Sequence, residues 1–258
     1  MTVTSSSASI PSFDLTGKRA LITGGSRGIG LAAAEALAAF GAHVTLLARP
    51  SADLDAAVEK LKAAGRSADA LELDVNDTAG LRTAIAARDP YNVLVNNAGT
   101  NQPVTFLEVT EAQFDTIMTL NVRAAYFVAQ AVAQRLVAAG QPGSIINVSS
   151  QMGHVGAATR TVYCASKWAM EGMTRAMAVD LAPHGIRVNT ICPTFVETPL
   201  ARRMLANEKF RSEVLTKIKF GRLGQVGDLT GAFVYLASDA SSLMTGTSMI
   251  IDGGWTAD

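Results

Sequence analysis

The chain has 258 residues, of which 48% are hydrophobic and 17% are charged, a balance typical of a globular protein with one substantial core. Lysine plus arginine equals aspartate plus glutamate, 22 each, so no overall field favours binding to nucleic acid. No apolar run reaches the roughly 18 residues that a bilayer-spanning helix needs. We therefore expect neither a nucleic-acid nor a membrane partner.

The beginning of the chain predicts no folded element. It is rich in serine and has neither a basic start nor an apolar stretch, so residues 1–12 are expected to form a flexible tail and not a signal peptide. The two cysteines, Cys164 and Cys192, stand in segments with a regular pattern. Buried free thiols in a reducing compartment are favoured over a disulfide, and the expected location is the cytoplasm.

From Lys18 almost to the end, short apolar runs alternate with helical patterns. The expected strands cover residues 19–23, 43–48, 68–73, 92–95, 144–148, 187–191 and 248–251. The expected helices cover 28–40, 52–64, 78–88, 111–139 (as one long helix or two), 162–181 and 227–237. Strands that are apolar on both faces and separated by helices indicate a parallel sheet covered on both sides. We predict one α/β domain over 13–258, a doubly wound Rossmann-type sheet of about seven strands with helices on both faces.

Residues 197–222 depart from this alternation. They follow the end of a strand, are rich in charge and methionine, and are long for a connection, as active-site lids tend to be. Within residues 199–222, seven lysines and arginines stand against two glutamates, a local charge of +5 in a neutral chain. Arg160 can add to the same entrance. A solvated helical face is the competing interpretation, but such an excess beside a pocket would attract anions.

Three glycines, Gly24, Gly28 and Gly30, lie between the first strand and the first helix. Glycine permits a tight turn and lets a pyrophosphate approach the backbone, while the helix N-terminus supplies unpaired N–H groups. A generic strand-to-helix turn is the alternative. The spacing Gly-x-x-x-Gly-x-Gly differs from the Gly-x-Gly-x-x-Gly fingerprint of dinucleotide binding.

Tyr163 and Lys167 are four residues apart and therefore share one face of a helix. A nearby cation lowers the pKa of a tyrosine from its usual value of about 10, so that the pair can exchange a proton with an alcohol or carbonyl. Taken alone, the pair has a competing interpretation: an amphipathic helix whose tyrosine packs at the edge of the core and whose lysine faces solvent. Ser150, the segment 96–99 and the glycine turn stand in the right order around it and favour the catalytic one.

Together these motifs resemble the single-domain short-chain dehydrogenases/reductases. The resemblance is carried by Thr23-Gly24-(x3)-Gly28-x-Gly30, Asn96-Asn97-Ala98-Gly99, Ser150 and Tyr163-(x3)-Lys167, and it runs from Phe13 to Trp255. It implies hydride transfer between a nicotinamide cofactor and a secondary alcohol/carbonyl pair, and a homotetramer assembled through helices 111–139 and 162–181.

The same resemblance implies four catalytic roles. Tyr163 is the general acid or base, Lys167 lowers its pKa and binds the nicotinamide ribose, and Ser150 binds the substrate oxygen. Ser150 is preferred to Ser149 because twelve residues separate it from the tyrosine. Asn121 holds a water that links the lysine to solvent, although a satisfied core amide is the alternative.

The cofactor-binding residues that the resemblance implies are Gly24, Ser26, Arg27, Gly28, Ile29, Gly30, Arg49, Asp74, Val75, Asn97, Ala98, Gly99, Tyr163, Lys167, Pro193, Val196 and Thr198. Ala48 stands where an NAD-preferring relative carries aspartate, and Arg49 follows it. With Arg27, Arg49 suits a ribose 2′-phosphate, so NADP(H) is expected to be preferred, with NAD(H) as the alternative.

Several of these residues have other interpretations. Asp74 can equally cap the next helix, and Thr198 can cap a lid helix. Thr194 stands where relatives carry glycine, which leaves the local backbone open. No metal is expected, because the three histidines show no ligand spacing. His154 is expected to line a pocket or face solvent, and Cys164 to be buried without a nucleophilic role.

The prediction is thus an NADP(H)-dependent oxidoreductase of a secondary alcohol or carbonyl, acting on a polar or anionic molecule such as a hydroxy acid, sugar or sugar acid. An NAD-dependent dehydrogenase of a neutral alcohol or polyol is the alternative. A cofactor-binding regulatory protein without turnover is disfavoured because every catalytic position is filled. A sugar-nucleotide epimerase or dehydratase is disfavoured by the chain length and the glycine spacing.

Overall fold

The computed structural model describes residues 10–257, apart from the side chains of Leu200 and Arg203. Its centre is a seven-stranded sheet in the order β3-β2-β1-β4-β5-β6-β7, and every neighbouring pair is parallel. The strands are β1 (Arg19–Thr23), β2 (His43–Ala48), β3 (Ala68–Glu72), β4 (Val93–Asn96), β5 (Gly143–Val148), β6 (Ile186–Pro193) and β7 (Ser248–Ile251). The predicted doubly wound sheet is confirmed, with strand ends within two residues of those expected.

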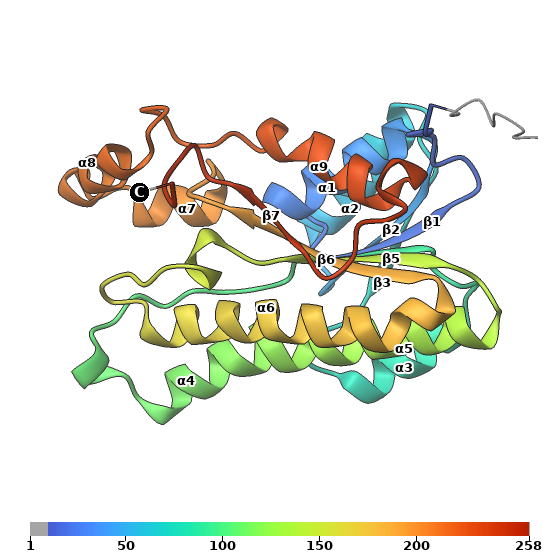
Figure 1. The fold of residues 1–258 in the computed structure, drawn as a ribbon, viewed down its shortest axis with the longest axis horizontal. Helices are drawn as coiled ribbons and strands as arrows, with labels where there is room; N and C mark the ends of the chain where they lie inside the picture. The colour runs from blue at the N-terminus through green and yellow to red at the C-terminus, as the bar shows by residue number, and fades with distance from the viewer. Residues whose placement is uncertain (1–9, 258) are drawn as a thin grey trace, which may run out of the picture.

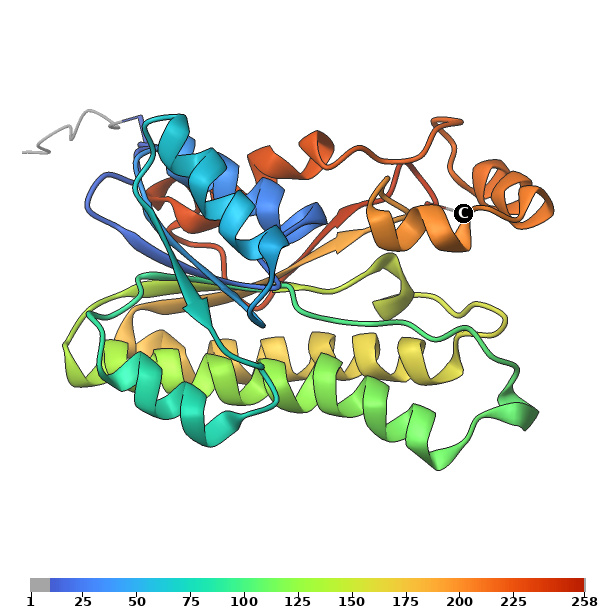
Figure 2. The ribbon, with the colours of Figure 1, turned by 180° about the vertical axis from the view of Figure 1, so that it is seen from behind.

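Helices cover both faces of the sheet, as Figures 1 and 2 show from opposite sides. One layer contains α1 (Gly28–Ala39), α2 (Ala52–Ala63) and α9 (Gly227–Ala237); the other contains α3 (Thr78–Ala86), α4 (Glu111–Met118), α5 (Ala125–Ala138) and α6 (Thr161–Leu181). Each layer buries its own apolar core against the sheet, since the strands are apolar on both faces. Among the described helices, none is long and apolar enough to cross a membrane.

Two segments depart from the regular alternation. Helices α4 and α5 form one continuous rod that passes through a π-helical turn at Thr119–Ala124, which the sequence did not reveal. The predicted lid contains α7 (Pro199–Met204) and α8 (Glu208–Lys217), which extend beyond the carboxyl end of β6 (Figure 1). Of the predicted tail, residues 1–9 lie outside the described part of the chain.

Candidate active site

A cleft of about 1250 Å³ runs over the carboxyl ends of β1, β2, β4, β5 and β6. In a doubly wound sheet this edge is where ligands bind, next to the point at which the strand order reverses between β1 and β4. The predicted catalytic and cofactor residues all line the cleft except Gly30 and Asn121, which lie directly behind its wall. The tertiary structure therefore brings together residues that are up to 174 positions apart, from Gly24 to Thr198.

The glycine turn is shaped by contacts that leave no room for side chains. Gly24 and Gly28 have φ angles of +64° and +59°, which only glycine adopts readily. A Cβ on Gly30 would lie 2.3 Å from the carbonyl oxygen of Gly24 and 2.5 Å from Nδ2 of Asn97. Because α1 begins here without a side-chain cap, its first N–H groups are available to an anion. The turn fits a dinucleotide pyrophosphate.

The turn is also tied to the neighbouring strand. Oγ1 of Thr23 accepts hydrogen bonds from the backbone N–H groups of Asn97 (2.9 Å) and Ala98 (3.0 Å). The Asn97 amide in turn donates from Nδ2 to the carbonyl oxygen of Thr23 at 3.0 Å. The ends of β1 and β4 are thus held as one surface, which explains why these two motifs occur together.

At the far end of the cleft, two arginines stand at the rim. Arg49 is exposed directly after β2, while Nη1 of Arg27 lies 3.4 Å from Oδ2 of Asp53. Both members of that pair are more than 60% exposed (67% and 62%), so the ion pair is weak and leaves Arg27 free to turn to a ligand. Ala48 at the end of β2 supplies no carboxylate at this place.

Asp74 and Val75 line the same end of the cleft. Asp74 accepts a hydrogen bond from the backbone of Asn76 at 2.9 Å. The cap of α3 is instead Asp77, whose Oδ1 accepts from the N–H of Gly80 at 2.9 Å. The interpretation of Asp74 as a helix cap was therefore wrong, because α3 begins at Thr78 and the residue directly before it is Asp77.

The proposed catalytic side chains meet in the middle of the cleft. Nζ of Lys167 is buried, donates to the carbonyl oxygen of Val148 at 2.8 Å, and lies 5.6 Å from the centre of the Tyr163 ring. Ser150, at the end of β5, donates to Oε1 of Gln151 at 2.8 Å and lies close enough to Tyr163 to favour a lower pKa of that hydroxyl. Ser149 and Ser150 both line the cleft, so the spacing-based choice of Ser150 stays a prediction.

Burial controls the proton affinities of this pair. It raises the pKa of Tyr163 above its ordinary value, against the hydrogen bond from Ser150 and the charge of Arg160. Burial also lowers the pKa of Lys167 to about 8, against the nearby Cys192 and Glu171. The expectation of a lowered Tyr163 pKa was therefore wrong for this arrangement, because loss of solvation outweighs the favourable charge.

Asn121 lies in the π-helical turn and is completely buried. Its Oδ1 accepts from the N–H of Thr100 at 2.8 Å, and Nδ2 donates to the carbonyl oxygen of Thr100 at 2.9 Å and to Oγ of Ser166 at 3.1 Å. Ser166 donates in turn to the carbonyl oxygen of Tyr163 at 2.7 Å. The amide is thus satisfied by protein, as the core-amide alternative expected, and it braces the helix that carries Tyr163. Its role toward a water stays a prediction.

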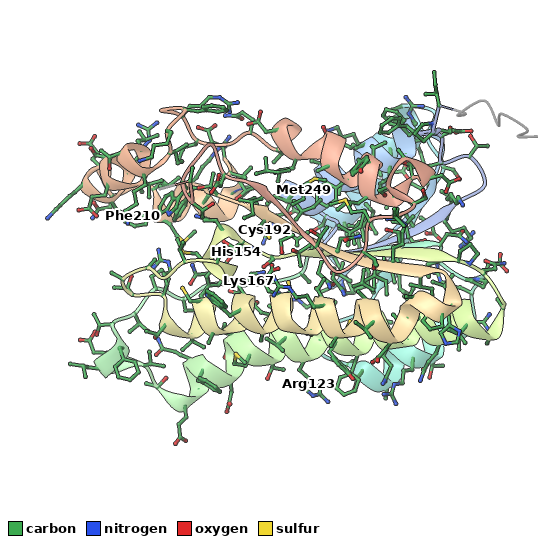
Figure 3. All side chains as sticks on the ribbon, in the orientation of Figure 1. Arg123, His154, Lys167, Cys192, Phe210 and Met249 are labelled. Atoms are coloured by element: carbon green, nitrogen blue, oxygen red, sulfur yellow. The ribbon has the colours of Figure 1, made fainter. Side chains whose placement is uncertain are left out.

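His154, Glu171 and Cys192 form a cluster near Lys167, and Figure 3 labels His154, Cys192 and Lys167. Nε2 of His154 lies 3.4 Å from Sγ of Cys192, which lies 3.3 Å from Oε1 of Glu171. Burial and the Glu171 charge raise the pKa of Cys192 to about 12, so the thiol is protonated at neutral pH. His154 is half-buried and does not line the cleft, contrary to expectation. The sequence concealed this cluster because its members come from three distant segments.

The lid is joined to the cleft at its start. Thr198 caps α7 by accepting a hydrogen bond from the N–H of Ala201 at 3.2 Å, and its methyl group lies against Gly28. The capping interpretation of Thr198 is confirmed, and its role toward the cofactor stays a prediction. Val196 forms a parallel bridge with Gly224. Thr194 does not adopt a positive φ, so threonine in place of glycine causes no strain there.

The basic residues of the lid face solvent. Arg202, Lys209, Arg211, Lys217, Lys219 and Arg222 are exposed, and none of these described side chains lines the cleft. The side chain of Arg203, which was counted with them, lies outside the described part of the structure. Arg160, which the sequence placed at the same entrance, does line the cleft. Cys164 is half-buried, and burial raises its pKa, which argues against a nucleophilic thiolate.

Comparisons with known proteins agree with this geometry. A family model described as enoyl-(acyl carrier protein) reductase matches residues 24–256. The chain is 38% identical to L-xylulose reductase of Bos taurus, over 94% of this chain and 98% of that protein. It is 38% identical to gluconate 5-dehydrogenase of Gluconobacter oxydans (strain 621H), over 95% of this chain and 96% of that protein. The crystal structure of a gluconate 5-dehydrogenase from Burkholderia cenocepacia J2315, in complex with NADP and tartrate, has a TM-score of 0.92 and 35% identity, covering 96% of this chain and 99% of that one.

Proposed function

The chain belongs to the short-chain dehydrogenase/reductase family and is an NAD(P)-dependent oxidoreductase acting on CH–OH groups, and we propose that it transfers a hydride between NADP(H) and the secondary alcohol or carbonyl of a sugar acid or similar anionic molecule. The observation that carries the proposal is the meeting of Ser150, Tyr163 and Lys167 in one cleft with the glycine turn.

Each residue has a task that its position supports. The Tyr163 hydroxyl gives a proton to the carbonyl oxygen during reduction and takes it back during oxidation; its raised pKa keeps that proton in place at neutral pH. Ser150 hydrogen-bonds the same oxygen and stabilises the charge that develops there. Lys167, with a pKa of about 8, is mostly charged at pH 7 and is held by Val148. When bound, the nicotinamide cofactor supplies or accepts the hydride.

The preference for NADP(H) is supported by the rim of the cleft. Arg49 is exposed at the end of β2, Arg27 lies in the glycine turn, and Ala48 leaves no carboxylate to accept a ribose 2′-hydroxyl. Two guanidinium groups suit a phosphate dianion. The Burkholderia relative carries NADP in its crystal structure, and the same cofactor suits this cleft. The relatives' names point to sugars and sugar acids as the substrate class.

The proposal extends to assembly and domain organisation. One face of α6 exposes Trp168 (55%) and Val179 (75%), and an apolar groove of about 440 Å³ between α5 and α6 is lined by Tyr126, Val137 and Leu181 among others. A second copy of this chain is the occupant that fits two parallel apolar helix faces, and a homotetramer follows when a second surface also pairs. The free thiols suit the cytoplasm, residues 13–258 form the catalytic domain after a tail, and residues 197–222 act as the lid.

The test is a cofactor-dependent absorbance assay at 340 nm with a panel of keto acids, ketoses and polyols, combined with a fluorescence titration of NADPH. Tyr163→Phe should lower turnover by about 10²- to 10⁴-fold and leave the NADPH dissociation constant nearly unchanged, because only the transferable proton is removed. Tyr126→Phe, which removes an exposed hydroxyl on α5, is the matched control and should keep full activity. Failure of the wild type to bind either dinucleotide would refute the proposal, as would near-normal turnover by Tyr163→Phe.

A further inference from the structure

Arg160 is a buried cation in the cleft for which the residues described here provide no counter-ion. The residue is only 6% exposed, yet it lines the cleft with Ser150 and Tyr163. Its hydrogen bonds run from Nη1 to the carbonyl oxygen (3.3 Å) and Oγ1 (2.9 Å) of Thr159, and no described carboxylate lies within 4.0 Å of it. Burying a charge without an opposite charge is costly, so such a group calls for a partner.

The backbone that precedes Arg160 is strained. Thr159 has a φ of +59° and is the one non-glycine residue in the described chain with a positive φ. A β-branched side chain is disfavoured there, and such outliers concentrate at functional sites. The carbonyl oxygen of Thr159 also accepts from the N–H of Val104 at 3.1 Å. This bond anchors the strained turn, which places Arg160 at the N-cap position of α6.

A lid residue packs against the guanidinium of Arg160. Cζ of Arg160 lies 5.5 Å from the centre of the Phe210 ring, which comes from α8 and is labelled in Figure 3. Phe210 packs edge-on against Phe195, with 5.7 Å between ring centres. This contact covers part of the guanidinium with an aromatic ring, and the N–H groups of an arginine suit a planar, bidentate acceptor. The burial also lowers the pKa of Arg160, which an anionic partner would restore.

We propose that Arg160 binds the carboxylate of the substrate and so selects hydroxy and keto acids over neutral sugars. The proposal rests on the function proposed above and refines it. Arg160 is the N-cap residue of α6, three residues before Tyr163, and both residues line the same cleft. A carboxylate bound by Arg160 therefore shares the cleft with the carbon that exchanges the hydride. The exposed lid cations contribute only long-range attraction, whereas Arg160 makes the contact.

The experiment compares Arg160→Gln and Arg160→Lys with Arg202→Gln, which removes an equal charge from an exposed site on α7. Each enzyme is assayed with NADPH and three ketones: 5-keto-D-gluconate, the neutral D-fructose and the phosphate ester D-fructose 6-phosphate. Calorimetric titration of the NADP-bound proteins with D-gluconate measures acid binding without turnover. The NADPH dissociation constant and the melting temperature report whether each variant is folded.

The wild type should prefer the keto acid to both other ketones and should bind D-gluconate. Arg160→Gln should lower kcat/KM for the acid by about 10- to 100-fold, the loss expected for a charged hydrogen-bonded pair, and change D-fructose turnover by less than about threefold. Arg160→Lys should recover part of the loss, because it keeps the charge without the bidentate edge. Arg202→Gln should change neither substrate by more than about threefold.

The proposal would be overturned by no preference for the acid in the wild type, equal losses for acid and ketose in Arg160→Gln, an equal effect of Arg202→Gln, or a preference for the phosphate ester. A wild type that binds no D-gluconate would also overturn it. If the wild type still binds NADPH and reduces a ketose in these cases, only the role of Arg160 is refuted. If the wild type does not bind NADPH, the proposed dehydrogenase function is refuted as well.

Discussion

Replacing Gly30 with alanine tests the glycine turn by adding a single methyl group. Gly30 lies in the first turn of α1, where helix propensity alone would favour alanine by about 0.5–1 kcal/mol. The packing opposes that gain, because the new Cβ would stand 2.3 Å from the carbonyl oxygen of Gly24 and 2.5 Å from Nδ2 of Asn97. The measured sign therefore shows which effect dominates.

The size of the disturbance follows from these distances. The Gly24 oxygen belongs to the backbone, and it must move by 0.7 Å to reach even the closest contact that real Cβ atoms show, 3.0 Å. Asn97 must move too, although its Nδ2 donates to the carbonyl oxygens of Thr23 (3.0 Å) and Gly24 (3.2 Å). Overpacking of this kind costs about 1–3 kcal/mol of stability. A misplacement approaching 1 Å in a preorganised site weakens its function by about 100-fold.

The assay is urea denaturation together with fluorescence titration of NADPH. Gly30→Ala should lose about 1–2 kcal/mol of unfolding free energy and weaken NADPH binding by about 100-fold. The matched control is Gly231→Ala in α9, where no atom lies within 4 Å of the added Cβ; it should gain about 0.5–1 kcal/mol and keep its NADPH affinity. An unchanged NADPH affinity in Gly30→Ala, with stability equal to or above that of the wild type, would refute the reasoning.

Three further predictions concern the rim, the lysine and the assembly. Arg49→Ala should weaken NADP(H) by about 10-fold or more and NAD(H) by less than about threefold, because only NADP(H) carries the 2′-phosphate; steady-state constants decide it, with exposed Arg66→Ala as control, and equal losses for both cofactors would contradict it. Lys167→Met should abolish turnover but raise the unfolding free energy at pH 7 by up to about 3 kcal/mol, because burial lowers the pKa of Lys167 from its ordinary 10.5 to about 8. The loss of the hydrogen bond to Val148 reduces this gain. Between pH 8 and 10.5 the unfolded chain holds this proton and the folded chain does not, so wild-type stability rises and the difference shrinks; an equal difference at pH 7 and pH 10 would count against it. Light scattering at micromolar concentration should give a tetramer that Val179→Asp dissociates, and a monomeric wild type would exclude that assembly.

Local patterns in the sequence were enough for the elements and the cofactor turn. Strands such as 43–48 and 248–251 are short apolar runs between helical patterns, and they appear in the structure with the expected bounds. Glycine spacing marked the turn because the backbone conformation there depends on the residue itself. Tyr163 and Lys167 were recognisable because four residues on a helix set their separation.

The tertiary structure alone decided burial and the partners of distant groups. Asp77, not Asp74, caps α3; Asn121 is held by Thr100 in a π-helical turn that no proline or glycine signals; and the pKa of Tyr163 is raised, not lowered. The lid cations that dominate the sequence face solvent, whereas the isolated Arg160 is buried beneath Phe210. Solvation and electrostatic energies depend on every atom within several ångströms, and most of those atoms belong to segments far away in the chain. A local pattern can therefore specify a helix or a turn, but the charge state and accessibility of a side chain are fixed only when the distant segments pack around it.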